Sequence, residues 1–290
     1  MNKGTGKAKQ MRRAFVTVCT ADHFQHYIPL YLYCLRNYGA DVHVFVRGEI
    51  DDMTNAALDV IGLYIHCIVE GIFLGYPFDV STTNCLRFIV DTPVLRGYDY
   101  LMITDIDLLL FEDPFPWHIN GLTDQPFCGH HGPYKFPKRP GISPWVGDME
   151  RVAGGFLLVT KDWWKKTDAA RKEYGKQLFE VDTKFGTYRE SDEVMLARII
   201  KDSGMSVPES KYFPPSLRGV HLGDFKSSMS HRWQNPQKMA SKLTIENCFK
   251  YQNMTMDDRW RAMVGCLAGD GVLMQILENV DIHIKSRGMS

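Results

Sequence analysis

Two aspartates, Asp105 and Asp107, stand one residue apart directly after an apolar stretch at 100–104 (YLMIT). Ionised carboxylates are rarely buried unless they are paired or bind a metal. Because alternate residues of a strand point the same way, both carboxylates can face one point. Such oxygen ligands suit Mg2+ or Mn2+, which commonly bind one or two carboxylates together with phosphate oxygens. The alternative interpretation is a solvated turn in which the Asp-x-Asp spacing has no function.

Paired glycines form a second candidate feature. Gly154 and Gly155 open the apolar stretch at 152–160, which favours close approach of a ligand or of another backbone. The preceding segment at 131–150 is rich in glycine, proline and aromatic residues and has no periodicity. A segment of that length is typical of a binding loop or lid, and the alternative is a surface insertion without function.

An acidic cluster and a histidine segment complete the candidate chemistry. Glu190, Asp192 and Glu193 open a predicted helix, where acidic residues also suit the positive helix end. Their number exceeds what a helix cap requires, so a functional role is an equal alternative. His221 and Lys226 lie further along, in GVHLGDFK, where a lone histidine is more often structural than a ligand.

The elements that must position these side chains alternate between strand and helix. Continuous apolar runs predict buried strands at Ala14–Cys19 and Val42–Val46. Helical spacing of apolar residues from Tyr27 to Leu35 predicts a helix that stops at Gly39. A helix at Asp52–Ile61 and a strand at Tyr64–Val69 follow. This order predicts a mostly parallel α/β sheet with right-handed crossovers, which binds ligands at the carboxyl ends of its strands.

Later segments extend the same architecture. The apolar pattern predicts a helix at Thr82–Leu95, a short strand at Gln125–His130, a strand at Val152–Thr160 and a helix at Asp162–Phe179. The region from Trp233 onward is mostly helical in pattern. We therefore expect a basic tail at 1–12, one α/β domain at 13–230, and a helical C-terminal annex at 231–290 packed on the same domain.

Composition restricts the function classes. The chain has 290 residues, 44% hydrophobic, and equal numbers of basic and acidic residues, 34 of each. The zero net charge argues against a nucleic-acid-binding surface. Seven scattered cysteines without zinc-ligand spacing indicate reduced core thiols. With no signal peptide and no transmembrane run, we expect a soluble cytoplasmic protein.

Taken in order, these motifs resemble GT-A glycosyltransferases, and family 8 most of all, over about Arg13–Lys226. The resemblance implies a Rossmann-like GT-A sheet and a D-x-D metal site at Asp105 and Asp107, completed by a late histidine at His221. It also implies Mn2+ or Mg2+ as cofactor. The family box H-x-x-G-x-x-K-P-W is matched in part by HLGDFK, with the glycine one place early.

The same resemblance assigns the donor-binding residues. A turn after the first strand receives the uracil of a UDP-sugar, and an arginine before the metal strand holds the nucleotide-sugar. The Val152 strand corresponds to the family's N-A-G strand and lies against the sugar. The residues implied are Thr20, Ala21, Asp22, Arg87, Asp105, Ile106, Ala153, Gly154, Gly155 and Lys226.

The acidic cluster corresponds to the family's D-Q-D segment near the acceptor. Asp192 is the first candidate for a catalytic carboxylate, with Glu190 and Glu193 behind it. It would act as base if configuration inverts, and would stabilise an oxocarbenium-like state if configuration is retained. The stereochemical outcome stays open.

The predicted function is metal-dependent transfer of a sugar from a nucleotide diphosphate to a hydroxyl of a glycan acceptor. One alternative is a nucleotidyltransferase, which usually carries a glycine-rich phosphate loop after the first strand. That position reads TADHFQ and has no glycine. The other alternative is an inactive glycan-binding protein on the same fold. The sequence leaves the sugar, the acceptor and the oligomeric state unassigned.

Overall fold

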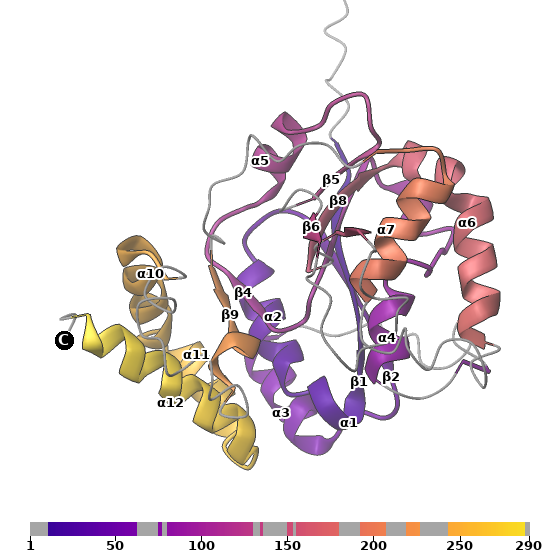
Figure 1. Ribbon diagram of the computed structural model, residues 1–290. Helices are drawn as coiled ribbons and strands as arrows, with labels where there is room; N and C mark the ends of the chain where they lie inside the picture. The colour runs from indigo at the N-terminus through magenta and orange to yellow at the C-terminus, as the bar shows by residue number, and fades with distance from the viewer. Residues whose placement is uncertain are drawn as a thin grey trace, which may run out of the picture.

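A five-stranded sheet forms the centre of the computed structural model (Figure 1). The structure describes residues 11–62, 75–76, 80–129, 134–135, 150–152, 155–179, 192–206, 219–226 and 243–287. The strands lie in the order β2 (Asp41–Arg47), β1 (Arg13–Thr20), β3 (Tyr100–Thr104), β8 (Phe156–Thr160) and β5 (Phe127–Gly129).

The strand directions confirm the predicted fold class. Strand β1 pairs in parallel with β2 on one side and with β3 on the other. Strand β8 is antiparallel to both β3 and β5, so β5 runs in the same direction as the first three strands. The sheet is therefore mostly parallel. Strand β1 lies between β2 and β3, which follow it in the sequence. The predicted strand at Tyr64–Val69 lies outside the described residues.

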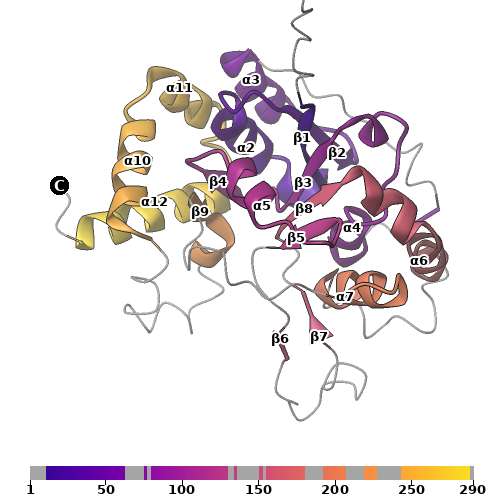
Figure 2. The same cartoon turned by 90° about the horizontal axis from the view of Figure 1, so that it is seen from above.

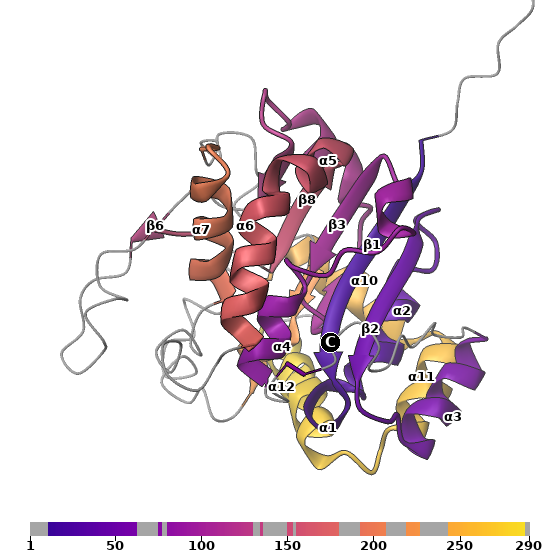
Figure 3. The same cartoon turned by 90° about the vertical axis from the view of Figure 1, so that its right-hand side faces the viewer.

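Helices cover both faces of the sheet because its strands are apolar on both sides. Along β1, Ala14, Val16 and Val18 face one core, while Phe15 and Cys19 face the other. The first core lies under α4 (Val80–Leu86), α6 (Lys161–Phe179) and α7 (Asp192–Asp202). The second lies under α2 (Tyr27–Leu35), α3 (Asp52–Ile61) and α5 (Phe115–Asn120), as the side view shows (Figure 3).

Three C-terminal helices extend the second core. They are α10 (Ile245–Thr255), α11 (Asp258–Cys266) and α12 (Gly271–Ser286), and they lie on the opposite side of the molecule from α6 and α7 (Figure 2). Their buried residues, including Tyr251, Trp260 and Ile276, belong to the same apolar cluster as α2 and Met102 of β3. The helical annex expected at 231–290 stays a prediction as a separate part of the domain.

Two short antiparallel pairs lie outside the main sheet. Strand β4 (Leu108–Leu110) pairs with β9 (Gly219–His221) in a register that sets Leu108 opposite His221. The strands approach closely, since a Cβ built on Gly219 would lie 2.0 Å from the Leu109 carbonyl oxygen. Strands β6 (Tyr134–Lys135) and β7 (Glu150–Arg151) form the second pair, beside α7 (Figure 2).

The predicted helix at Thr82–Leu95 is too long. Helix α4 ends at Leu86, and the chain continues in turns whose Phe88 and Ile89 amides bond three residues back. Pro93 has no N–H to give to the Ile89 carbonyl and disfavours helical backbone in the residue before it. Arg171 of α6 donates to that carbonyl instead, at 3.2 Å.

The strand predicted at Val152–Thr160 begins later, at Phe156, because its partner β3 ends at Thr104, directly opposite Phe156.

Within the described residues, all six cysteines have free thiols, five of them buried, as the sequence predicted. No described helix combines the length and apolarity needed to cross a membrane.

Candidate active site

Three polar side chains meet at the carboxyl edge of β3. Asp105 follows β3 directly, and its amide donates to the Gly155 carbonyl at 3.1 Å. Asp107 precedes β4, whose register with β9 brings His221 alongside, so that Nε2 of His221 lies 3.1 Å from Oδ1 of Asp107. The potential ligand atoms of Asp105, Asp107 and His221 all lie within 4.8 Å of one another.

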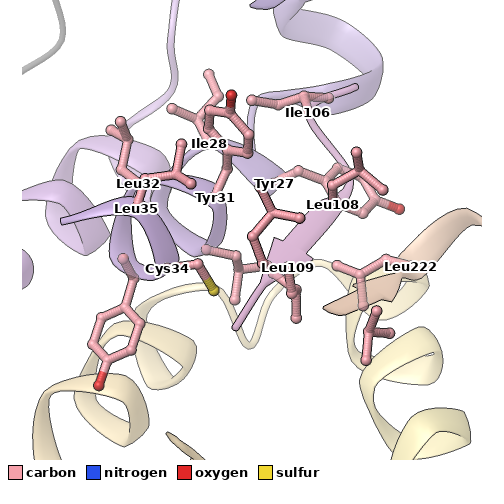
Figure 4. Close-up of a cluster of buried hydrophobic side chains, with 14 of the residues drawn as sticks. Tyr27, Ile28, Tyr31, Leu32, Cys34, Leu35, Ile106, Leu108, Leu109 and Leu222 are labelled. Atoms are coloured by element: carbon pink, nitrogen blue, oxygen red, sulfur yellow. The ribbon is translucent and has the colours of Figure 1, made fainter. Parts of the chain in front are cut away.

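Apolar packing fixes the segments that carry these side chains. Ile106 and Leu108, on either side of Asp107, are buried in the same apolar cluster as α2, and Leu222 next to His221 belongs to this cluster too (Figure 4). The Leu222 amide also donates to the Asp107 carbonyl at 2.8 Å. The two chain segments are separated by more than a hundred residues in the sequence, yet they are held in one rigid unit.

Charge pairing sets the protonation of the centre. Burial opposes the charged form of His221, but the Asp107 carboxylate, aided by Asp224, outweighs it and raises the pKa of His221 to about 10. Burial likewise opposes ionisation of Asp107, yet the neighbouring imidazole lowers the pKa of this carboxyl. These shifts favour an ionised Asp107 paired with a protonated His221, so a metal ion bound here would take the place of the proton on the imidazole.

Two glycines leave room around the carboxylates. A Cβ built on Gly155 would lie 2.5 Å from Oδ2 of Asp105, and one on Gly223 would lie 2.7 Å from Oδ2 of Asp107. Either side chain would displace a potential ligand oxygen. The donor set of two carboxylates and one imidazole, with this glycine cradle, fits a divalent ion such as Mn2+ or Mg2+. Asp105, Asp107 and His221 would hold it.

Arg87 joins this centre to the acidic start of α7. Its guanidinium lies just after α4, is nearly buried, and donates through one terminal nitrogen to Asp105 and through the other to Asp192. The guanidinium is thus a bridge between a potential metal ligand and the carboxylate predicted to be catalytic. The start of α7 is also linked to the segment that precedes β8, because the Val152 amide donates to the Glu193 carbonyl at 3.3 Å.

These groups line a cavity of about 230 Å3. The strand order reverses between β1 and β3, and open α/β sheets bind ligands at the carboxyl ends of the strands at such a point. The described residues that line the cavity are Val18, Cys19, Phe24, Asn84, Arg87, Asp105, Ile106, Asp107, Gly155, Asp192, Glu193 and His221.

Other predicted site residues lie at the rim or outside the described residues. The Nζ of Lys226 lies 5.0 Å from the centroid of the Phe24 ring, which itself lines the cavity. Thr20 and Ala21 are buried where β1 enters α1 (Ala21–Phe24), and Asp22 is exposed and paired with the neighbouring imidazole. Glu190, Ala153 and Gly154 lie outside the described residues.

The sequence interpretation missed several residues of the site. Asn84 and Phe24 line the cavity, and Asp224 lies 3.6 Å from Nδ1 of His221 through its Oδ2. The spacing of His221 and Asp224 is a usable signal, since the residue before a helical turn can face the third residue of that turn. Asn84 stands three residues before Arg87 and carried no comparable pattern.

Fold and site together define an α/β protein with a carboxylate–histidine centre at the carboxyl edge of its sheet. No protein-family model matches the chain, and neither does any curated protein. Solved structures with a related fold include the galactosyltransferase LgtC in complex with donor and acceptor sugar analogs. It is 17% identical, with a TM-score of 0.41 over 64% of this chain and 70% of that one.

Two further structures resemble the chain to a similar degree. The apo-form glycosyltransferase GlyE of Streptococcus pneumoniae TIGR4 is 14% identical, with a TM-score of 0.42 over 91% of this chain and 64% of that one. A 4-diphosphocytidyl-2C-methyl-D-erythritol synthase of Anaerococcus prevotii is 11% identical, with a TM-score of 0.37 over 70% of this chain and 90% of that one. The expected GT-A glycosyltransferases are thus found among the structural neighbours, at low identity, and the functional argument rests on the site.

Proposed function

We propose that the chain is a metal-dependent glycosyltransferase that moves a sugar from a nucleoside diphosphate, UDP in the first instance, to a hydroxyl of a glycan acceptor. The observation that supports this most is the convergence of Asp105, Asp107 and His221 within 4.8 Å at the carboxyl edge of the sheet. A divalent cation held there would offset the negative charge that grows on the diphosphate leaving group.

Protein groups around the centre have separate roles in this proposal. Lys226, at the rim beside Phe24, supplies a fixed positive charge toward the diphosphate. Asp192 faces the cavity from the start of α7, where it takes the acceptor proton or stabilises positive charge on the sugar ring. Arg87 holds Asp105 and Asp192 at a fixed separation, so the leaving-group side and the acceptor side keep one geometry.

The direct test is release of nucleoside diphosphate from a panel of nucleotide-sugars with Mn2+, with Mg2+ and with a chelator. We expect release with one nucleotide-sugar that stops on chelation and falls about 100-fold or more in Asp107→Asn, because this variant loses a ligand of the cation that offsets the charge of the leaving group. Asp258→Asn is the matched control, since that carboxylate is exposed on α11 and its loss leaves the site unchanged.

Two other outcomes would contradict the proposal. Release of pyrophosphate from a nucleoside triphosphate and a sugar phosphate, with inert nucleotide-sugars, would identify a nucleotidyltransferase. Binding of a glycan without turnover of any nucleotide substrate would identify a glycan-binding protein on this fold.

A further inference from the structure

The turn after His221 places a second carboxylate behind the imidazole. Residues Leu222–Phe225 form a 3-10 turn, and His221 is the extended residue that precedes it, three positions before Asp224. As a result Oδ2 of Asp224 lies 3.6 Å from Nδ1 of His221, on the ring nitrogen opposite the one that faces Asp107. Asp224 is only 5% exposed, and a carboxylate at that depth requires partners for its charge.

This turn is anchored from several directions. Asn279 of α12 donates to the Phe225 carbonyl at 2.9 Å, and the Phe225 ring lies 6.0 Å from the ring of His283. On the other side, Leu222 is fully buried in the core under α2. Asp224 therefore has little freedom to move away from the imidazole.

The imidazole is held equally closely on its other edge. A Cβ built on Gly223 would lie 3.2 Å from Nε2 of His221, so the backbone of the turn passes directly over this nitrogen. Asp107 approaches the same nitrogen at 3.1 Å. Since the ring lies between these groups and Asp224, each ring nitrogen has one defined environment.

We propose that Asp224 is a positioning residue of the metal centre, which accepts the Nδ1 proton of His221 and thereby reserves the lone pair of Nε2 for a divalent cation. The inference rests on the proposed metal centre and adds a residue to it. A metal-bound histidine generally gives its other N–H to a carboxylate, carbonyl or water, which fixes its tautomer and orientation. At 3.6 Å the two groups interact by charge and lie just beyond hydrogen-bond distance.

The proposal also accounts for the spacing of this segment. In HLGDFK the glycine stands two residues after the histidine and the aspartate three residues after it. Because Gly223 has no side chain, the backbone of the turn can pass close to Nε2 of His221. Asp224 is placed so that its carboxylate faces Nδ1. Both positions contact the imidazole, which is the physical reason for the order of these residues.

Mn2+ affinity, measured by the loss of the free-ion electron paramagnetic resonance signal, tests the inference without reference to turnover. We expect Asp224→Ala to bind Mn2+ about 10–100-fold more weakly than wild type. Asp224→Asn keeps an acceptor oxygen without the charge and should fall between the two. Asp91→Asn is the control, because Asp91 is a mostly buried carboxylate paired with Arg96 and Arg171 outside the cavity, and it should leave Mn2+ affinity unchanged.

A measurement on the wild-type protein covers the case in which the variants fail to fold. Long-range proton–nitrogen spectra of 15N-histidine-labelled protein distinguish the two imidazole tautomers. With Mg2+ added, we expect the His221 signals to show Nδ1 protonated and Nε2 unprotonated. The Nε2-protonated tautomer with Mg2+ bound, or wild-type Mn2+ affinity in a folded Asp224→Ala variant, would overturn the inference.

These outcomes separate the inference from the proposed function. If Mn2+ affinity depends on Asp224 but no nucleotide-sugar is turned over, the transferase proposal fails and the role of Asp224 stands. If nucleotide-sugars are turned over and Asp224→Ala binds Mn2+ as wild type does, the role of Asp224 fails alone. Absence of any Mn2+ binding by wild type would contradict the metal centre on which both the transferase proposal and the role of Asp224 depend.

Discussion

Space beside the carboxylates decides whether the centre can form. Gly155→Ala places a methyl group 2.5 Å from Oδ2 of Asp105, so the carboxylate must move. We expect Mn2+ affinity to fall about tenfold or more, as is typical when the orientation of a ligand is lost. Gly265→Ala on α11 meets nothing within 4 Å and should leave Mn2+ affinity unchanged. Titration calorimetry of the two variants makes the comparison, and equal affinities would place the metal elsewhere.

Arg87 offers a second test at the scale of one residue. Arg87→Lys keeps a positive charge but cannot bind Asp105 and Asp192 through two separate nitrogens of a planar group. We expect nucleotide-sugar turnover to fall about 10–100-fold through kcat, because both carboxylates lose a fixed orientation. Steady-state kinetics measure the effect. A fall confined to KM would instead indicate that Arg87 contacts the donor alone.

At the scale of elements, His26 joins the starts of two helices. Its Nε2 lies 2.7 Å from Asp51, which caps α3, and its Nδ1 lies 2.6 Å from Asp270, which caps α12. Burial lowers the pKa of His26, but hydrogen bonds to the two carboxylates outweigh it and raise the pKa above 6.5. The same contacts help to lower the pKa values of Asp51 and Asp270 below 3.8.

This bridge gives stability a defined pH dependence. Because the His26 pKa is raised in the folded state, its contribution is complete below pH 6.5 and disappears as pH rises through the folded-state pKa. The lowered carboxyl pKa values add stability above pH 3.8 that is lost as pH falls. We expect His26→Ala to cost about 1–2 kcal/mol near pH 5.5, allowing for solvent screening, and less at pH 9. Urea unfolding across this range checks it, and a constant difference would contradict the bridge.

Much of this element scale could be predicted from the sequence. Apolar runs located β1, β2 and β3, and helical spacing located α2, although the helix ends at Leu35 and not at the expected stop, Gly39. Pro93 indicated that the helix predicted at Thr82–Leu95 was too long, but the sequence did not show that Arg171 of a distant helix takes the Ile89 carbonyl. Tertiary contacts of that kind leave no periodic signal.

The sequence predicted which residues form the site better than it predicted the contacts among them. Asp105, Asp107 and His221 lie together as the resemblance implied, although their roles stay predictions. The contact expected between Arg87 and a nucleotide-sugar stays a prediction, and the sequence did not indicate that Arg87 also joins two carboxylates. That contact depends on how α4 and α7 pack, which the sequence of either helix does not specify.

At the scale of the whole molecule, one apolar cluster joins the C-terminal helices to the sheet. It includes Trp260 of α11, whose ring lies 5.2 Å from that of Tyr33 on α2. We therefore expect the described α/β core and annex to unfold in one cooperative transition, with far-ultraviolet and near-ultraviolet circular dichroism changing together. Trp260→Ala should lower the free energy of unfolding by about 3–5 kcal/mol while preserving a single transition. Two separate transitions in wild type would show that the annex is an independent unit.

Thermal stability with nucleoside diphosphates and nucleotide-sugars, with and without Mn2+, tests the central claim most directly. A ligand at about 100 times its dissociation constant adds roughly 2.7 kcal/mol to the free energy of unfolding. We predict a rise in melting temperature with one nucleotide-sugar that requires Mn2+ and is absent in Asp107→Asn. A rise that is independent of Mn2+ and unchanged in Asp107→Asn, or no rise with any nucleotide, would contradict a metal-dependent nucleotide-sugar site at Asp105, Asp107 and His221.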